Sequence, residues 1–490
     1  MAEVVVVGAG VGGLAAAIRL GAAGHEVTVV DRLDRVGGKL DERSVGGFTW
    51  ETGPSLLTLR SVFDELATIA GRRLDDLVDL VRLDPICRYR FADGSGFDHR
   101  ADLADAAAAV ERFAPGAGEH WRAFMDHAAR VWAVSERTFF AGPMASPLRL
   151  LRRMRSPRDF VDIDPLRSLH ARAETSFDDP RLVQYVDRYA TYSGSSPYRA
   201  PATLACIPHL EQALGAWYVL GGLGRLADAL GTLAADVNVE LRLSSEVDAV
   251  TSDGSRATGV RLAGGEHLDA DAVVANADAL HLYRDLLPHR RARRWAQAAP
   301  RSSSGFVLLL GVEGTTDGLA HHNISFSADY EAEFDALFRD HEPIADPTVY
   351  VSASSVTDPG QAPAGHENWF VLVNAPSGSA DRGDFGGYGD RLLEVLAERG
   401  WDLSGRIVHR EEISPADIAE RYRTPGGAIY GTSSNGVLAT FLRPGNRGPI
   451  DHLYLCGGSS HPGGGLPLVA ISGRIAADLA HADLVDADLG

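Results

Sequence analysis

The sequence predicts an α/β fold, and three observations near the start of the chain support this prediction. Residues 4–7 are four consecutive valines, a run typical of a buried strand. Three glycines follow in the spacing G-x-G-x-x-G and lead into an alanine-rich helical segment. Residues 27–30 form a second β-branched run, which an acidic residue ends. In this order the features predict a Rossmann-like domain that binds a dinucleotide.

Each glycine of the turn has a physical role in binding a nucleotide. Gly8 allows the tight turn, Gly10 lets a pyrophosphate approach the backbone, and Gly13 lets the helix pack against the strand. The helix N-terminus directs its free N–H groups and the positive end of its dipole at the phosphates. Asp31 ends the second strand about 20 residues beyond the motif, the separation expected for a partner of a ribose hydroxyl.

The residues after the second strand indicate which dinucleotide is bound. Arg32 follows Asp31 directly, and the pair Gly37 and Gly38 precedes a cation, Lys39. Such a pair allows a second close approach of backbone to phosphate, and an ammonium group can neutralise phosphate charge. On its own a glycine pair beside a lysine is a common surface turn. Placed just beyond the acid of the second strand, it favours FAD over NAD.

Length and composition predict a soluble globular protein of two or three domains. The 490 residues are enough for a large core, with 45% hydrophobic and 23% charged residues. A formal net charge of -19 argues against nucleic acid as a partner. The three cysteines are far apart and fit neither a metal site nor a disulfide framework, so we expect no metal and a cytoplasmic location. No apolar run is long enough to span a bilayer, so any membrane contact is expected to be peripheral.

Residues 61–204 are predicted to form a largely helical insertion, because apolar residues recur there at helical spacing. Within it, residues 148–158 contain five arginines interleaved with leucine and methionine. A basic amphipathic stretch of this kind can dock on an anionic membrane surface. The alternative is a solvated helix face whose arginines pair with nearby acids.

The rest of the chain is predicted to return to the nucleotide domain twice. Residues 205–280 contain short strands and a glycine turn that opens a helix, whereas residues 281–444 form a second insertion with strands and helices. Residues 450–467 then form a strand followed by glycines and a helical pattern. The nucleotide domain is therefore expected to be discontinuous, comprising residues 1–60, 205–280 and 445–490.

With both ends considered, the chain resembles the FAD-dependent phytoene desaturase family of bacterial and fungal carotenoid desaturases. The most specific element is residues 453–467, LYLCGGSSHPGGGLP, which is similar to the flavin-binding signature of that family. Residues 272–278 and 321–327 are also similar to it. The resemblance implies a FAD-binding domain of the glutathione reductase and amine oxidase type. It also implies a mixed α+β substrate domain and a helical insertion that faces a membrane.

The resemblance implies a set of contacts to FAD. The positions are Gly8, Gly10, Gly13, Asp31, Arg32, Gly37, Gly38, Lys39, Val247, Gly458, Gly463, Gly464 and Leu466. The first four match the ADP-ribose motif, which Arg32 adjoins, and the next three match the phosphate loop. Val247 matches a backbone contact to adenine, and the last four match the turn beside the isoalloxazine ring. Lys39 stands where arginine is common in the family.

The reaction of the family removes a hydride and a proton from adjacent saturated carbons. The flavin accepts the hydride, and the protein must hold a long apolar polyene in a tunnel that excludes water. Two residues are candidates for the proton acceptor, His461 beside the predicted flavin turn and Glu211 on the segment that returns to the flavin domain. For His461 a structural role in that turn is an equally good interpretation. Candidates for the tunnel wall, or else for ordinary core packing, are Trp132, Phe139, Phe140, Trp217 and Tyr218.

The resemblance predicts an acyclic carotenoid or related polyene as the substrate, and oxygen or a quinone as the electron acceptor. Residues 321–327 are closer to relatives that desaturate hydroxylated carotenoids, which suggests a 3,4-desaturation late in the pathway. Because such substrates are insoluble in water, we expect a peripheral protein at the inner face of the cell membrane.

Three other functions are compatible with parts of the sequence. The N-terminal motif also occurs in other flavin oxidases and saturases, such as amine, protoporphyrinogen and retinoid enzymes, but residues 453–467 favour the carotenoid branch. Related non-catalytic proteins hold isoprenoid tails without flavin chemistry, and two intact flavin turns argue against that role. The C-terminal turn also argues against a NAD-dependent dehydrogenase.

Overall fold

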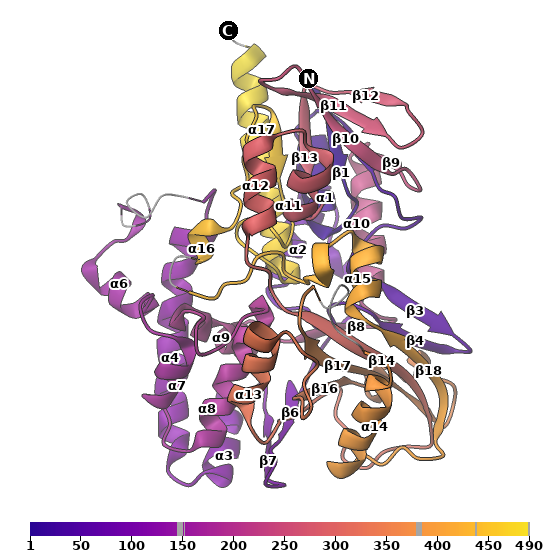
Figure 1. Cartoon of the computed structure of the whole chain (residues 1–490). Helices are drawn as coiled ribbons and strands as arrows, with labels where there is room; N and C mark the ends of the chain where they lie inside the picture. Colours follow the sequence, from indigo (N-terminus) through magenta and orange to yellow (C-terminus); the bar gives the residue numbers. More distant parts are fainter. Residues whose placement is uncertain (145–149, 151, 379–384, 437–438, 489–490) are drawn as a thin grey trace.

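The computed structural model describes residues 1–144, 150, 152–378, 385–436 and 439–488. Figure 1 shows a parallel sheet with its helices at the top, a larger mixed sheet at the lower right and a group of helices at the lower left. Both chain termini lie at the top, in the part that contains the parallel sheet. Among the described residues, no helix has the length and apolar composition that crossing a bilayer requires.

The parallel sheet is assembled from segments far apart in the chain. Its order is β19-β13-β1-β2-β9, and all neighbouring strands are parallel. The strands are β1 (Glu3–Val7), β2 (Glu26–Val30), β9 (Glu240–Arg242), β13 (Ala272–Ala275) and β19 (Leu453–Leu455). This arrangement confirms the predicted α/β fold, and it brings both glycine turns to the carboxyl edge of one sheet, where open α/β sheets bind ligands.

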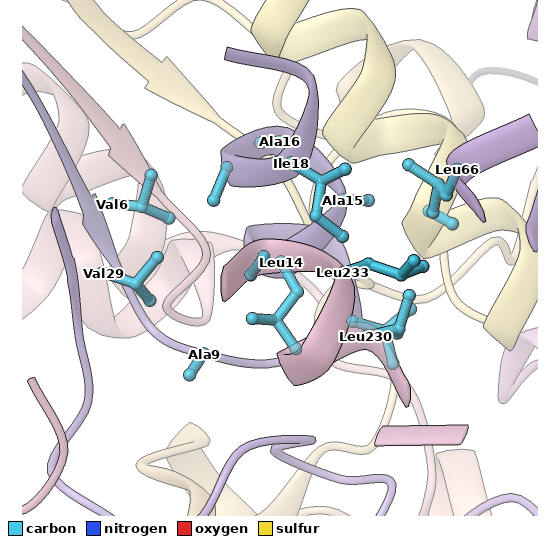
Figure 2. Close-up of a cluster of buried hydrophobic side chains, with 14 of the residues drawn as sticks. Val6, Ala9, Leu14, Ala15, Ala16, Ile18, Val29, Leu66, Leu230 and Leu233 are labelled. Atoms are coloured by element: carbon cyan, nitrogen blue, oxygen red, sulfur yellow. The ribbon is translucent and has the colours of Figure 1, made fainter. Parts of the chain in front are cut away.

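The two faces of this sheet have different covers, because alternate side chains of a strand point in opposite directions. Val4 and Val6 of β1 pack with four helices, α1 (Val11–Ala22), α2 (Ser61–Ile69), α10 (Gly224–Asp236) and α17 (Leu466–Asp488). Figure 2 shows Val6 and Val29 facing Leu14, Leu230, Leu233 and Leu66 in this cluster. Val5 and Val7 pack on the other face with a three-stranded sheet and a helix, namely β10 (Val247–Ser252), β11 (Ala257–Leu262), β12 (His267–Asp269) and α12 (Arg290–Ala298).

Helices α1 and α17 pack unusually closely, which sets the two glycine turns beside each other. A Cβ atom on Gly473 of α17 would lie 2.3 Å from the carbonyl oxygen of Gly12 in α1. Only glycine fits this crossing, since real Cβ atoms do not approach a carbonyl oxygen so closely. The N-termini of both helices therefore face the same space at the edge of the sheet.

The second sheet has seven strands in the order β18-β14-β17-β16-β15-β6-β7. The strands are β6 (Cys87–Arg90), β7 (Gly96–His99), β14 (Ser304–Glu313), β15 (His322–Ser325), β16 (Val349–Ser352), β17 (His366–Ala375) and β18 (Ile407–Ile413). β6 pairs in parallel with β15, so the segment 61–204 contributes two strands to a sheet whose other strands come from residues 281–444. One face of the sheet is covered by α14 (Tyr388–Glu398).

Most of segment 61–204 is helical and packs around an aromatic core. Trp121, Phe124 and Tyr185 are fully buried in this core together with Tyr89 of β6, which joins the helices to the seven-stranded sheet. Besides α2, its described helices include α3 (Leu103–Phe113), α4 (Ala117–Ser135), α6 (Pro157–Ile163), α7 (Leu169–Glu174) and α8 (Pro180–Asp187), and α9 (Cys206–Ala213) follows the segment. The remaining elements used below are β4 (Phe48–Glu51) and α15 (Pro415–Tyr422).

Candidate active site

A single cavity of about 780 Å³ runs from the carboxyl edge of the parallel sheet to the seven-stranded sheet and the helices. At one end it is lined by Val7 and Val30, the last residues of β1 and β2. At the other end it is lined by apolar residues such as Ile207, Leu210 and Phe370. The glycine turns and the apolar chamber are therefore parts of one space.

The first glycine turn is closed to any side chain. Gly8 has φ +103°, a conformation that L-residues rarely adopt. A Cβ atom on Gly13 would lie 2.0 Å from the Gly8 carbonyl oxygen, and one on Gly10 would lie 2.7 Å from Asn276 Nδ2. Asn276, from the residue after β13, also donates from Nδ2 to the Gly8 carbonyl oxygen at 3.3 Å. The turn thus presents bare backbone at the N-terminus of α1.

Asp31 is held at the end of β2 by two backbone donors. Its carboxylate accepts hydrogen bonds from the N–H of Ala9 at 2.7 Å and of Leu33 at 2.8 Å. Burial raises the pKa of Asp31, and these two hydrogen bonds oppose that rise. The adjoining Arg32 donates from Nη2 to the carbonyl oxygens of Glu420, at 2.9 Å, and Arg421. Both Asp31 and Arg32 line the cavity.

The second loop lies directly against the first turn. Gly37 donates its N–H to the Ala9 carbonyl oxygen at 2.9 Å, and a Cβ on Gly38 would lie 3.1 Å from the Cα of Gly10. Lys39 Nζ donates to the Ile429 carbonyl oxygen at 2.7 Å. Burial lowers the pKa of Lys39, and the Asp278 carboxylate opposes this shift. The loop therefore places a cation at the cavity, between the two glycine turns.

The C-terminal turn completes the cofactor end of the cavity. Gly458, Gly463, Gly464 and Leu466 line it, and α17 begins at Leu466. Gly463 has φ +132°, and a Cβ on Gly464 would lie 2.3 Å from Cδ1 of Tyr430. Val247, the first residue of β10, lines the cavity as well. All thirteen predicted cofactor positions except Gly13 line this one space, and Gly13 supports it from behind.

Sequence analysis missed three residues that shape this end, Asn276, Arg443 and Tyr430. Arg443 is 6% exposed and donates from Nη1 to the carbonyl oxygens of Gly458 at 2.8 Å and Tyr430 at 3.0 Å. Burial lowers the pKa of Arg443 to about 10. Asn276 lies within residues 272–278, which the resemblance marks, but its contact with the first turn was not predicted. No local pattern marks Arg443 or Tyr430.

The residues at this end fit FAD. A pyrophosphate needs close backbone approach and N–H donors, and two helix N-termini with side-chain-free turns supply them. A ribose hydroxyl needs an acceptor, which the fixed carboxylate of Asp31 supplies. The second turn at Gly463 and Gly464, together with Lys39, extends the cradle beyond what a single dinucleotide motif requires.

The two candidate proton acceptors occupy different positions. His461 is 1% exposed and is not among the residues that line the cavity. Its Nε2 lies 3.1 Å from the Gly142 carbonyl oxygen, and its ring packs edge-on against Phe139 at 4.7 Å between centroids. Burial lowers the pKa of His461 to about 4. Its carbonyl oxygen accepts from the Ser472 hydroxyl at 2.6 Å, so the residue ties the turn to α17.

Glu211, on α9, does line the cavity and is 1% exposed. Its carboxylate accepts hydrogen bonds from the hydroxyl of Tyr189 at 2.9 Å and from the hydroxyl of Tyr192. Burial raises the pKa of Glu211, and the nearby Arg188 and the two tyrosines oppose the rise. Arg188 and Tyr192 line the cavity beside it.

The chamber wall differs in part from the predicted set of aromatic residues. Phe139 and Phe140 line the cavity, whereas Trp132, Trp217 and Tyr218 do not. The wall also contains three polar residues whose contacts with one another were not predicted, Ser55, His322 and Tyr350. The Ser55 hydroxyl, after β4, lies 2.5 Å from the Tyr350 hydroxyl. That hydroxyl lies 2.8 Å from His322 Nδ1. This chain of contacts links the loop after β4 to the seven-stranded sheet.

Part of the wall comes from the segment around α6. Leu150, Met154, Ile163 and Pro165 line the cavity. Of the basic stretch 148–158, residues 148, 149 and 151 lie outside the described residues. Among the others, Arg152, Arg155 and Arg158 are exposed.

One of these arginines, Arg158, also fits the alternative interpretation of the stretch as a solvated face whose arginines pair with acids. Arg158 pairs with Asp162 at 3.9 Å, and Arg153 donates to the Thr138 carbonyl oxygen at 2.9 Å.

Comparison with known proteins places the chain among flavin enzymes. A model of the family described as flavin containing amine oxidoreductase matches residues 11–481. The chain is 36% identical over 490 residues to a 4,4'-diapolycopene oxygenase from a Methylomonas species, with 98% of each chain covered. It is 34% identical over 500 residues to a 1-hydroxycarotenoid 3,4-desaturase from a Flavobacterium species, covering 98% of this chain and 99% of that one.

Among solved structures, the fold is similar to that of an oxidoreductase from Methanosarcina mazei. The TM-score is 0.65 at 17% sequence identity, with 97% of this chain and 100% of that chain covered. At this identity the likeness concerns the fold alone.

Proposed function

Because this chain belongs to the family of flavin-containing amine oxidoreductases, we propose that it is a FAD-dependent desaturase of acyclic carotenoids. The observation that carries the proposal is the single cavity, which joins a cradle that fits FAD to a chamber with an apolar wall. The names of the relatives from Methylomonas and Flavobacterium, which refer to carotenoids, support the same substrate class.

The chain contributes binding, orientation and exclusion of water. Bound FAD supplies the hydride acceptor. The cofactor contacts are assigned to the predicted positions from Gly8 to Leu466, with Asn276 and Arg443 holding the two turns in place. The apolar wall around Ile207, Leu210 and Phe370 holds the polyene and keeps water from the reacting carbons. Oxygen or a quinone remains the predicted final electron acceptor.

The proton acceptor stays a prediction with two candidates. His461 lies behind the cavity wall, and Glu211 lies in the wall but already accepts hydrogen bonds from two tyrosines. For proton transfer a base must reach the substrate within hydrogen-bond distance, which favours Glu211 over His461 on geometry. Burial raises the pKa of Glu211, and a raised pKa makes its carboxylate a stronger base.

We also propose that the segment around α6 docks on the inner face of the cell membrane. Phe160, Val161 and Leu166 are 39%, 71% and 69% exposed, and they flank Ile163 and Pro165 in the cavity wall. Figure 1 places α6 at the outer edge of the helical part. Exposed apolar side chains with arginines nearby suit an anionic lipid surface, and they would place a lipid-soluble substrate at the cavity.

Pigment analysis tests the function. The chain is expressed in bacteria that accumulate phytoene, lycopene or a hydroxylated acyclic carotenoid, with a Gly13→Val variant as the control that lacks bound FAD. We expect a shift of pigment absorption to longer wavelength in at least one strain, because each added conjugated bond has that effect, and no shift with the variant. Unchanged pigments in all strains, with FAD bound to the purified protein, would contradict the function.

A further inference from the structure

Three charged and polar residues interrupt the apolar wall of the chamber. They are Arg188, Tyr192 and Glu211, which we call the polar cluster, and all three line the cavity. Arg188 Nη2 donates to the Tyr192 hydroxyl at 3.1 Å, and that hydroxyl donates to the Glu211 carboxylate. The described residues form no direct ion pair with Arg188, so the cation and the carboxylate are linked through one tyrosine hydroxyl.

The polar cluster is held rigidly from behind. Arg188 Nη1 donates to the hydroxyl of Tyr89 at 2.8 Å, and its guanidinium lies over the rings of Tyr189 and Tyr192 at 5.4 and 5.1 Å. Tyr189 also donates to Glu211 at 2.9 Å. Tyr89 and Tyr189 are fully buried. Three tyrosines thus hold one cation and one carboxylate in the wall of the chamber.

The cluster has hydrogen-bonding capacity left on its cavity side. The two tyrosine bonds use two of the five N–H groups of Arg188, and the two accepted bonds use two of about four lone-pair positions of Glu211. A pure hydrocarbon placed against these groups would remove water from them and offer nothing in return, which is costly for a buried cation and carboxylate. A polar group on the bound molecule would use this capacity, which a hydrocarbon cannot do.

The geometry points to a hydroxyl group on the substrate, and we propose that the polar cluster binds the hydroxyl at one end of an oxygenated acyclic carotenoid. A hydroxyl oxygen accepts from Arg188 while its proton is donated to Glu211, so one group satisfies both partners. A carboxylate end would be repelled by Glu211, and a carbonyl end would satisfy only Arg188. This inference rests on the proposed function and narrows its substrate class. It gives Glu211 a role in substrate binding.

Binding measurements test the inference independently of turnover. The FAD-loaded protein is titrated, by quenching of its tryptophan fluorescence, with a hydroxylated acyclic carotenoid and with the hydrocarbon of the same chain length. A third probe is the same chain with a terminal carboxylate. We expect the hydroxylated compound to bind about 10- to 100-fold more tightly than either of the others, the range typical of hydrogen bonds to charged groups.

Variants locate the preference in the cluster. We expect Glu211→Gln and Arg188→Lys to reduce the preference for the hydroxylated compound to about threefold or less, with the hydrocarbon bound no more weakly than by the wild type. Tyr330→Phe is the matched control, because Tyr330 lines the same cavity and its buried hydroxyl has no hydrogen-bond partner among the described residues. It should leave the preference unchanged. Flavin absorbance and the melting temperature show for each variant that the protein is folded.

The inference is overturned if the wild-type protein binds the hydroxylated compound and the hydrocarbon equally. It is also overturned if Glu211→Gln and Arg188→Lys both keep the preference of the wild type. Tightest binding of the carboxylate compound overturns the assignment to a hydroxyl. Failure of the proposed function gives a different result. In that case no strain in the pigment analysis forms a desaturated product, but the binding titration still shows the preference in the wild type and its loss in the variants.

Discussion

The Cα of Gly13 lies so close to the carbonyl oxygen of Gly8 that a Cβ at position 13 would approach this oxygen to 2.0 Å. The contact is between backbone atoms of the turn that ends β1 and opens α1, so no side-chain movement can relieve it. The position of helix α1 over the cofactor cradle depends on this absence of a side chain.

We therefore expect Gly13→Ala to abolish FAD binding, because α1 must shift away from the first turn. Gly264 provides the control, since in the described part of the chain no atom lies within 4 Å of a Cβ built there. Purified Gly264→Ala should carry the flavin absorbance of the wild-type protein, and Gly13→Ala should lack it. Retention of flavin by Gly13→Ala would contradict the close contact.

Lys39 joins the phosphate loop to a distant part of the chain through its 2.7 Å hydrogen bond to the Ile429 carbonyl oxygen. Lys39→Met removes a charge-assisted hydrogen bond and a cation from the cofactor end of the cavity. We expect the FAD dissociation constant to rise about 10- to 100-fold, from titration of the apoprotein with FAD. Lys39→Arg keeps the charge and should bind FAD within about threefold of the wild type. An equal rise of the FAD dissociation constant in Lys39→Met and Lys39→Arg would argue against a role for the positive charge at position 39.

His461 makes the stability of the fold depend on pH. Burial lowers its pKa to about 4, whereas an unfolded histidine titrates at about 6.5. Between these values the unfolded chain binds more protons at this residue, so the stability contributed by the neutral ring is complete above about pH 6.5 and is lost as the pH falls to about 4.

We expect the unfolding free energy of the wild type to fall more steeply over this interval than that of His461→Gln, by up to about 1.4 kcal/mol per pH unit. Urea unfolding at several pH values gives both slopes. His120→Gln, at an exposed histidine, should have the wild-type slope. If the unfolding free energy depends on pH in the same way in the wild type and in His461→Gln, the buried ring is not the titrating group.

The exposed apolar residues of α6 should control membrane binding. We expect the double substitution Phe160→Asp and Val161→Asp to reduce sedimentation with anionic vesicles at least about tenfold, because it adds charge where the surface is proposed to enter the lipid. Val408→Asp is the control, since Val408 is 53% exposed and lies on β18, in the seven-stranded sheet. Similar vesicle binding by the double variant and the control would reject α6 as the docking surface.

The sequence alone determined the nucleotide-binding part of this protein, because the signals there are local. The spacing of Gly8, Gly10 and Gly13 and the acid after the second strand describe a turn, a helix start and a strand end that lie within 31 residues. Backbone conformation at such positions depends on the residues themselves, so short-range patterns are enough. The C-terminal flavin turn was readable for the same reason.

Only the tertiary structure decided what lies around the cofactor and the chamber. Asn276 holds a turn 268 residues away in sequence and Arg443 one 15 residues away, and β6 joins a sheet formed mainly by residues beyond 300. Arg188 and Tyr192 meet Glu211 because α9 packs against the segment that follows α8. Hydrogen bonds of this kind join side chains whose separation is set by packing, and no periodicity in the sequence encodes it. For that reason the sequence left both His461 and Glu211 as candidates, and the fold places only Glu211 in the wall of the cavity.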